Sequence, residues 1–215
     1  MKKHLSITQK MLAPAVVLFG AVACISETET PLIHQSQVEI ATTEEGGENL
    51  KKGGFMPYEE SFVNQIFPQT INEGEFAGFY LPGTGTGKAR GAGKVFSFIN
   101  QRPISDTESM PAPVTLFFEE QLEGFGIVDI PQNVNSVTVS ESGNAIFFES
   151  GINRVIGLTP EGLVKFEAEI TIVGGTKKFK NATGEGKLTG SYDADPNSLN
   201  AGQGTSKIEA LIKLN

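Results

Sequence analysis

Apolar side chains recur at every second position over much of the chain after Phe55, and the clearest run is LVKFEAEITIV at 163–173. The even-numbered positions of this run are apolar, whereas the odd-numbered positions between 165 and 171 carry Lys, Glu and Thr. Successive side chains of a β-strand point to opposite faces, so this period of two predicts a half-buried strand rather than a helix. The expected inward set is Val164, Phe166, Ala168, Ile170 and Ile172.

Other segments repeat the pattern. Residues 93–101 place Val95 on one face and Phe96 and Phe98 on the other. Two hairpins are expected, with turns at 142–144 and 159–162, because Gly, Asn and Pro favour chain reversal there. The expected inward set of the last strand, 206–215, is Ile208, Ala210, Ile212 and Leu214.

Two segments are harder to interpret. Residues 113–130 are long and apolar enough for a bent strand, or for two strands with a bulge near Gly124 or Gly126. Residues 57–67, PYEESFVNQIF, are the best helical candidate in the domain. About eight short strands joined by turns predict an all-β protein, either a sandwich or an up-and-down antiparallel barrel.

The first 24 residues predict export instead of a folded element. Three lysines precede an apolar run that ends in Ala-Val-Ala-Cys, so residues 1–23 resemble a signal peptide and Cys24 resembles the lipidated cysteine of a bacterial lipobox. The run is too short to span a bilayer, which needs roughly 20 apolar residues. Ile25 follows the cysteine, and the lack of Asp there resembles lipoproteins of the outer membrane.

Residues 24–54 are rich in Glu, Thr, Ser and Gly and predict a lipidated cysteine followed by a flexible acidic tether. The predicted barrel domain then covers 55–215. The chain has a net charge of −8, which becomes −11 when residues 1–23 are removed with their three lysines. An acidic chain lacks the basic surface that nucleic-acid binding requires, so no nucleic-acid partner is expected.

Two glycine-rich segments invite a phosphate-binding interpretation. In GTGTGKARGAGK at 83–94, Lys88 is followed by Ala89 and then by a strand, whereas a phosphate-binding loop needs Ser or Thr there and a helix after it. A flexible β-connection is therefore preferred. In TKKFKNAT at 176–183, Phe179 is expected to plug the barrel end, and the three lysines are expected to form a solvated face.

The segment GGTKKFKNATGEGKLTG at 174–190 resembles the G-G-T-G-[KR]-F-x-x-A-T-G-x-G-x-x-x-G corner of allene oxide cyclase-like and dirigent-like barrels, which also occurs in secreted bacterial proteins of unassigned function. The matching residues are Gly174, Gly175, Thr176, Lys178, Phe179, Ala182, Thr183, Gly184, Gly186 and Gly190. Lys177 departs from the pattern, which has Gly at that position. The resemblance implies a calycin-like, eight-stranded antiparallel barrel. It implies no activity, because no catalytic residue of the plant enzymes matches a position here.

The residues after Phe55 include no His and no Cys, which excludes Ser-His-Asp and Cys-His chemistry within 55–215 as well as zinc sites built on those ligands. No cofactor is expected. Glu149 or Arg154, if inward, would anchor a ligand in an apolar cavity; a surface salt bridge is the preferred alternative. Tyr80 and Tyr192 are candidates for the pocket mouth. Glu119 and Glu120, and Asp193 and Asp195, are expected to be solvated.

The sequence leaves two functions open. The first is a membrane-tethered, non-enzymatic barrel that binds a small apolar ligand or a partner protein. The second, supported by the resemblance alone, is a cyclase-like or isomerase-like enzyme that uses the cavity as a template. An interior filled with apolar side chains would argue against both ligand binding and catalysis.

Overall fold

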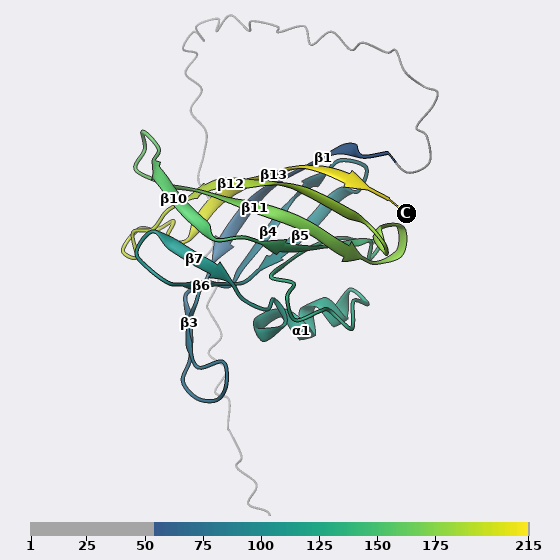
Figure 1. Ribbon diagram of the computed structural model, residues 1–215. Helices are drawn as coiled ribbons and strands as arrows, with labels where there is room; N and C mark the ends of the chain where they lie inside the picture. The colour runs from purple at the N-terminus through teal and green to yellow at the C-terminus, as the bar shows by residue number, and fades with distance from the viewer. Residues whose placement is uncertain (1–53, 215) are drawn as a thin grey trace, which may run out of the picture. The chain divides into compact units, whose positions relative to one another are not determined.

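The computed structural model describes residues 54–214 (Figure 1). The predicted signal peptide at 1–23, the lipidation site Cys24 and the tether up to residue 53 lie outside the described residues. The elements in chain order are β1 Met56–Ile66, β2 Gln69–Ile71, β3 Gly78–Tyr80, β4 Gly83–Ala89, β5 Gly93–Ile99, β6 Gln101–Pro103, β7 Glu108–Pro111, α1 Thr115–Gly124, β8 Ser136–Ser140, β9 Ala145–Ser150, β10 Asn153–Leu158, β11 Val164–Gly175, the 3₁₀ turn η1 Lys177–Phe179, β12 Thr183–Tyr192 and β13 Gln203–Lys213.

Eight of these strands form a closed antiparallel barrel. Their order is β12-β13-β1-β4-β5-β8-β9-β11, and β11 pairs again with β12, which completes the circle. The β11–β12 ladder is long, running from Val164 opposite Tyr192 to Ile172 opposite Gly184. The predicted all-β, eight-stranded antiparallel barrel is therefore confirmed, and its closure leaves these strands without open edges.

The predicted alternation also agrees with the barrel. Val95, Ile170 and Ile212 lie in a buried cluster in the barrel interior. Phe98, which was predicted on the face opposite Val95, points out of the barrel and belongs to a second buried cluster on the outer surface of the barrel wall. Both predicted hairpins are present, because β8 pairs with β9 and β10 pairs with β11.

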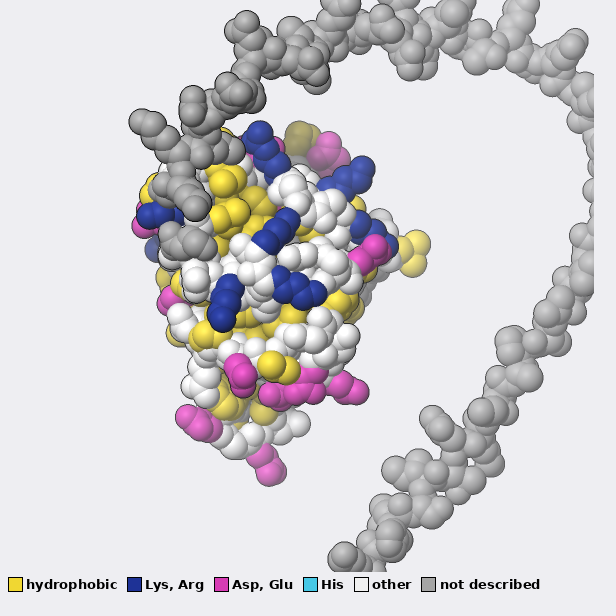
Figure 2. Space-filling view, turned by 90° about the vertical axis from the view of Figure 1, so that its right-hand side faces the viewer, with side chains coloured by type: hydrophobic (Ala, Val, Ile, Leu, Met, Phe, Trp, Pro, Cys, Tyr) yellow, Lys and Arg dark blue, Asp and Glu magenta, His cyan; other side chains and the backbone are white. Residues whose placement is uncertain are grey.

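One end of the barrel is closed by the turn η1 between β11 and β12. Phe179 is buried, and its ring meets that of Tyr58 edge-on with centroids 6.4 Å apart, as expected for a plug. Lys177 Nζ donates to the carbonyl of Ser142, and Lys178 Nζ donates to the carbonyl of Gly91 at 2.6 Å. Figure 2 faces this end, where Lys and Arg side chains stand out above the surface. These two lysines are solvated, and they also tie the plug to neighbouring turns.

Residues 113–130 form a helix and not the predicted strands. Val114, Phe118 and Leu122 are four residues apart, so they share one helical face, and that face covers the outward side chains of Phe98 and Val137. The N-cap position, Val114, supplies no side-chain cap, which removes the usual start signal. The helix ends in a Schellman motif in which Gly126 is left-handed and Ile127 N–H donates to Leu122 O at 3.0 Å. Gly126 is thus a helix stop rather than a bulge.

Residues 57–67, the helical candidate, lie almost entirely in strand β1. Tyr58, Glu60 and Phe62 are buried, while Glu59, Ser61 and Val63 are exposed. The alternation was hidden because an inward position carries Glu60 and an outward position carries Val63. A period-two pattern that mixes polar and apolar residues on both faces is weak evidence for a strand.

Three short strands extend the wall at the end opposite η1. β6 continues from β5, β10 continues from β9, and β7 lies between them, giving the order β10-β7-β6 (Figure 1). β10 pairs with the first residues of β11, and β9 pairs with its last residues. The hairpin β2–β3 forms a separate two-stranded sheet. Residues of β6, β7 and β10 line the cavity at the open end of the barrel.

Inward glycines let the strands approach closely. A Cβ on Gly186 would lie 2.3 Å from the carbonyl oxygen of Glu209 and 2.6 Å from Cα of Ala210, both backbone atoms of β13. Neither atom can move without disturbing the ladder. We therefore expect Gly186→Ala to lower the free energy of unfolding by about 2 kcal/mol, the usual size of an overpacking penalty.

The measurement is urea-induced unfolding followed by far-UV circular dichroism. Gly124→Ala is the matched control, because no atom lies within 4 Å of its added Cβ. Equal stability of the two variants would show that the β12–β13 approach does not require glycine.

Candidate ligand site in the barrel

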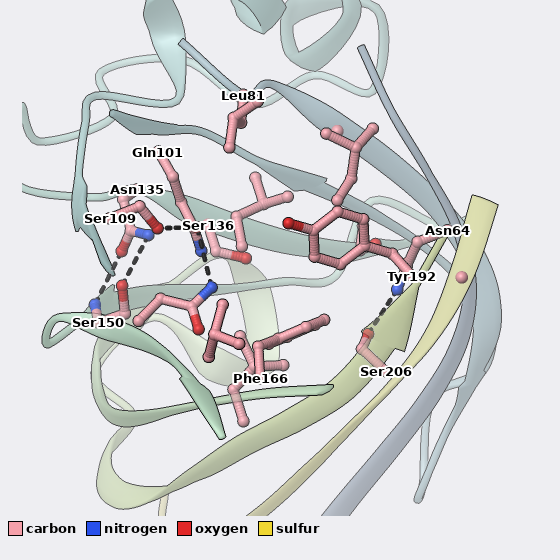
Figure 3. Close-up of a pocket in the computed structure, with 18 of the residues that line it drawn as sticks. Asn64, Leu81, Gln101, Ser109, Asn135, Ser136, Ser150, Phe166, Tyr192 and Ser206 are labelled. Atoms are coloured by element: carbon pink, nitrogen blue, oxygen red, sulfur yellow. Dashed lines mark hydrogen bonds between the residues drawn. The ribbon is translucent and has the colours of Figure 1, made fainter. Parts of the chain in front are cut away.

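The open half of the barrel contains a cavity of about 210 Å³ (Figure 3). Thr138, Phe148 and Ile170 are among the residues deepest along the barrel axis, beyond which the interior is filled by the plugged core. The cavity is therefore a pocket with one end closed. An eight-stranded barrel is just wide enough for its interior to be filled by side chains or to hold one small ligand. In this barrel, side chains fill the half near η1, and the other half contains the cavity.

Much of the cavity wall is apolar. The apolar side chains come from six barrel strands and flanking segments, and they are Phe62, Ile66, Leu81, Ile99, Pro103, Phe148, Val155, Phe166, Ile170, Leu188 and Ile208. Phe166 and Tyr192 pack against each other with ring centroids 6.1 Å apart. A Cβ on Gly190 would lie 2.5 Å from the Phe166 ring, so glycine there makes room for the aromatic side chain. These surfaces suit an apolar ligand.

A cluster of polar side chains lies where the three short strands meet at the open end. Gln101 of β6 accepts two hydrogen bonds on Oε1, from Ser109 Oγ of β7 at 2.6 Å and from Asn153 Nδ2 of β10 at 2.9 Å. Gln101 and Ser109 are both more than nine-tenths buried. Asn153 is paired with Ser109 in the β10–β7 ladder, and Gln101 lies on β6 two positions from Pro103, which is the partner of Ser109 in the β7–β6 ladder.

Two further polar pairs line the same cavity. Asn135 and Ser150 exchange two bonds, since Asn135 Nδ2 donates to Ser150 Oγ at 2.9 Å and Ser150 N–H donates to Asn135 Oδ1 at 2.8 Å. On another part of the wall, Asn64 Nδ2 donates to Ser206 Oγ at 2.7 Å. Figure 3 shows the Gln101 and Asn135 groups facing Tyr192 and Asn64 across the cavity. The ligand site thus has a polar side and an aromatic side.

A carboxyl group lies buried close to the floor. Glu60 of β1 is 1% exposed, accepts a hydrogen bond from Tyr58 Oη at 2.5 Å, and accepts another from Thr138 Oγ1 of β8 at 2.8 Å. β1 and β8 are not neighbours in the barrel, so this bond spans the interior. Thr138 lines the cavity, whereas Glu60 lies behind it.

Burial raises the pKa of Glu60 to about 7, against an ordinary value of 4.5, while the two hydroxyl donors oppose this shift. Burial, and then the neighbouring Glu60, raise the pKa of Tyr58, which therefore stays a phenol at neutral pH. The interior consequently contains a carboxyl group that titrates near neutrality, held between two hydroxyl groups.

Of the four predicted ligand-binding residues, only Tyr192 lines the cavity. Tyr80 is buried outside it, where its hydroxyl donates to Phe76 O at 2.8 Å. Glu149 faces outward and accepts from Asn133 Nδ2 at 3.0 Å. Arg154 forms an exposed salt bridge with Glu108 at 3.0 Å. Tyr80, Glu149 and Arg154 are therefore not part of the cavity lining. Glu149 is odd-numbered on β9, whose inward positions are even-numbered, and Arg154 forms a surface salt bridge, which was the preferred alternative for this residue.

The remaining candidates have structural explanations. The prediction of a flexible connection at 83–94 is wrong for most of its length, because residues 83–89 form strand β4 and β5 begins at Gly93. A strand at 83–89 also differs from the loop and following helix of a phosphate-binding loop. Glu119 and Glu120 are both exposed on α1. Asp193 Oδ1 accepts from the N–H of Asp195 at 3.0 Å within a turn. Among residues 54–214, no three His, Cys, Asp or Glu side chains are grouped to hold a metal ion. No helix in the described part of the chain is long and apolar enough to cross a membrane.

Sequence reasoning missed Glu60 and the Gln101 cluster. Glu60 lies two residues from both Tyr58 and Phe62, so it would be predicted to point inward with them if β1 were recognised as a strand. Gln101, Ser109 and Asn153 are distant in sequence and lie in strands of three to six residues. Only the sheet topology brings these three together.

Searches against known protein families, curated proteins and solved structures gave no match to the chain. The eight-stranded antiparallel barrel itself is consistent with a calycin-like fold.

The shifted pKa of Glu60 makes stability depend on pH. A carboxyl group with a raised pKa binds its proton more tightly in the folded state, so its stabilising effect is complete below pH 4.5 and is lost as the pH rises through about 7. We expect the wild type to lose up to about 3 kcal/mol of unfolding free energy over this window, a loss that Glu60→Gln does not show.

Urea unfolding at a series of pH values tests this expectation. Glu59→Gln is the matched control, because Glu59 is the exposed neighbour on the same strand and should leave the pH dependence unchanged. Parallel pH profiles for the wild type and Glu60→Gln would contradict it.

Proposed function

We propose that this protein is a non-enzymatic binding protein of the bacterial cell envelope that holds one small, mainly apolar ligand in its barrel. The observation that carries the proposal is the cavity of about 210 Å³ between apolar walls and a cluster of amide and hydroxyl groups. Ligand pockets in proteins combine an apolar lining with a few polar groups in this way.

The size of the cavity supports a small ligand. An apolar cavity of roughly 150 Å³ in another protein is large enough to bind benzene. The present cavity is larger, and an extended chain of several carbons would fill it. Side chains such as Phe148 and Ile170 are held in strands on both sides, so the site exists before a ligand arrives, which lowers the entropic cost of binding.

The enzymatic alternative has less support. A template enzyme of the allene oxide cyclase-like or dirigent-like kind would be consistent with the calycin-like barrel and with the 174–190 resemblance. However, Glu60 lies behind the cavity wall and each of its oxygens accepts a hydroxyl donor. Asp106, Glu108 and Tyr192 are the titratable residues on the described lining. This arrangement favours holding a ligand over transferring a proton to it.

The open cavity likewise favours a ligand over a purely structural role. A barrel selected only to present its outer surface to a partner protein could fill its interior completely, as this barrel does around Tyr58 and Phe179. Keeping inward positions such as Ser97, Ser136 and Ser206 small leaves space unfilled. Unfilled apolar volume lowers stability, so it calls for a functional reason.

Filling the cavity should abolish binding. Ser136 lines the cavity and its hydroxyl has no described hydrogen bond, so Ser136→Leu adds bulk there without breaking one. We expect 1-octanol to bind the wild type and to bind Ser136→Leu at least about tenfold more weakly, as measured by isothermal titration calorimetry. Thr86→Leu is the control, because Thr86 is exposed on β4. If octanol bound the wild type and both variants with equal affinity, its binding site would lie outside the cavity, and the proposal would be contradicted.

The envelope location is tested separately. If residues 1–23 are removed and Cys24 is acylated, intact-mass spectrometry of protein purified from its native host should show a mature chain that begins at Cys24 with added acyl chains. Several acyl chains would anchor the chain stably, because each buried CH₂ contributes roughly 0.8 kcal/mol. An unmodified Cys24 would contradict the lipoprotein assignment, and Cys24→Ser in the same host is the control. The same spectra under native conditions would reveal a ligand that copurifies.

A further inference from the structure

We infer that the ligand carries an uncharged, hydrogen-bonding head group, such as an alcohol or an amide, which lies against the Gln101 cluster. This inference rests on the proposed function, because it names the chemical class of ligand that the same cavity takes. It is drawn from the charges and the hydrogen bonds along the cavity lining.

The lining offers no positive charge to an acidic ligand. Among the described residues that line the cavity there is no Lys, Arg or His, whereas Asp106 and Glu108 lie at its rim. The guanidinium of Arg154 on β10 does not line the cavity and is already paired with Glu108 at 3.0 Å on the exposed side. A carboxylate entering the cavity would lose water, gain no cation and pass the unpaired negative charge of Asp106.

A cationic head group is disfavoured for a related reason. Asp106 is exposed in the turn between β6 and β7, so its attraction to a cation is weakened by solvent. Below the rim, the polar side chains are amides and hydroxyls such as Gln101, Ser109 and Asn153. An ammonium group there would leave water without reaching an ionised partner, which costs more free energy than neutral hydrogen bonds return.

The Gln101 cluster has the hydrogen-bonding capacity that a neutral head group requires. Gln101 is 7% exposed, its Oε1 accepts two bonds, and no described hydrogen bond uses its Nε2 donor. The Oδ1 acceptor of Asn153 is one of two buried side-chain atoms without a partner in the described residues. An alcohol or an amide can accept from Gln101 Nε2, whereas Asn153 Oδ1 is enclosed by protein atoms and becomes available to a ligand donor only if its amide group turns toward the cavity.

The arrangement of the cavity sets the orientation of such a ligand. The Gln101 cluster lies at the open end, and Phe62, Leu188 and Ile208 lie along the barrel beyond it. The apolar body would therefore point toward the floor, with the head group at the mouth. A pure hydrocarbon bound in the cavity would leave the Gln101 Nε2 donor without a partner and without water, and an unpaired buried donor costs free energy.

A series of eight-carbon compounds that differ only in the head group tests the inference. The probes are 1-octanol, octanamide, octanoate and octylamine, titrated into the purified protein by calorimetry at about pH 7.5, where the last two are charged. We expect the alcohol and the amide to bind at least about tenfold more tightly than either charged compound. Octanoate or octylamine binding as tightly as octanol would overturn the inference and leave the proposed function standing. Absence of binding by all four would overturn both.

A variant at the rim of the cavity tests whether the negative charge of Asp106 disfavours an acidic ligand. Asp106 is exposed and has no described side-chain hydrogen bond, so Asp106→Lys should fold normally. We expect it to narrow the preference for octanol over octanoate by about threefold or more. Glu185→Lys makes the same change of charge at an exposed outward position near the plugged end, and it should leave the preference for octanol over octanoate unchanged. The same preference in Asp106→Lys and the wild type would overturn the role of the acidic rim.

Discussion

The pairing of β11 with β12 is the interaction on which the rest of this structure depends. It joins the two edges of an eight-stranded sheet, so every inward side chain must share one narrow interior. Close approach of β12 to β13 relies on inward glycines such as Gly186. Once the sheet is closed, the size of each inward residue determines whether that level of the barrel is filled or hollow.

The two ends of the barrel use this constraint differently. At the η1 end, Phe179 and Tyr58 fill the interior, and lysines fasten the plug to adjacent turns. At the other end, serine and glycine at inward positions leave a cavity. Glu60 lies at the junction of the two regions, buried between Tyr58 and Thr138. A buried carboxyl group lowers stability above neutral pH, but its bond to β8 fixes the distance between opposite walls at the cavity floor.

The polar mouth results from strands that leave the barrel. β5 and β9 each continue past the closed sheet as β6 and β10, and β7 bridges them. Gln101, Ser109 and Asn153 are brought together by this bridge, and their hydrogen bonds leave a donor and an acceptor unused. The Gln101 cluster therefore depends on tertiary structure more than the barrel does, since each of its three residues comes from a different short strand.

Period-two alternation and local turn residues predicted an all-β protein, the inward sets of β11 and β13, and both hairpins, and the choice of an eight-stranded barrel over a sandwich came from the resemblance of residues 174–190. The sequence did not determine α1, whose N-cap lacks a polar side chain, or β1, whose inward face includes Glu60. Of the four candidate ligand-binding residues that it named, only Tyr192 lines the cavity. Only the tertiary structure decided which residues meet in the cavity, because strand pairing brings together groups as distant as Glu60 and Thr138, and no local pattern encodes that pairing.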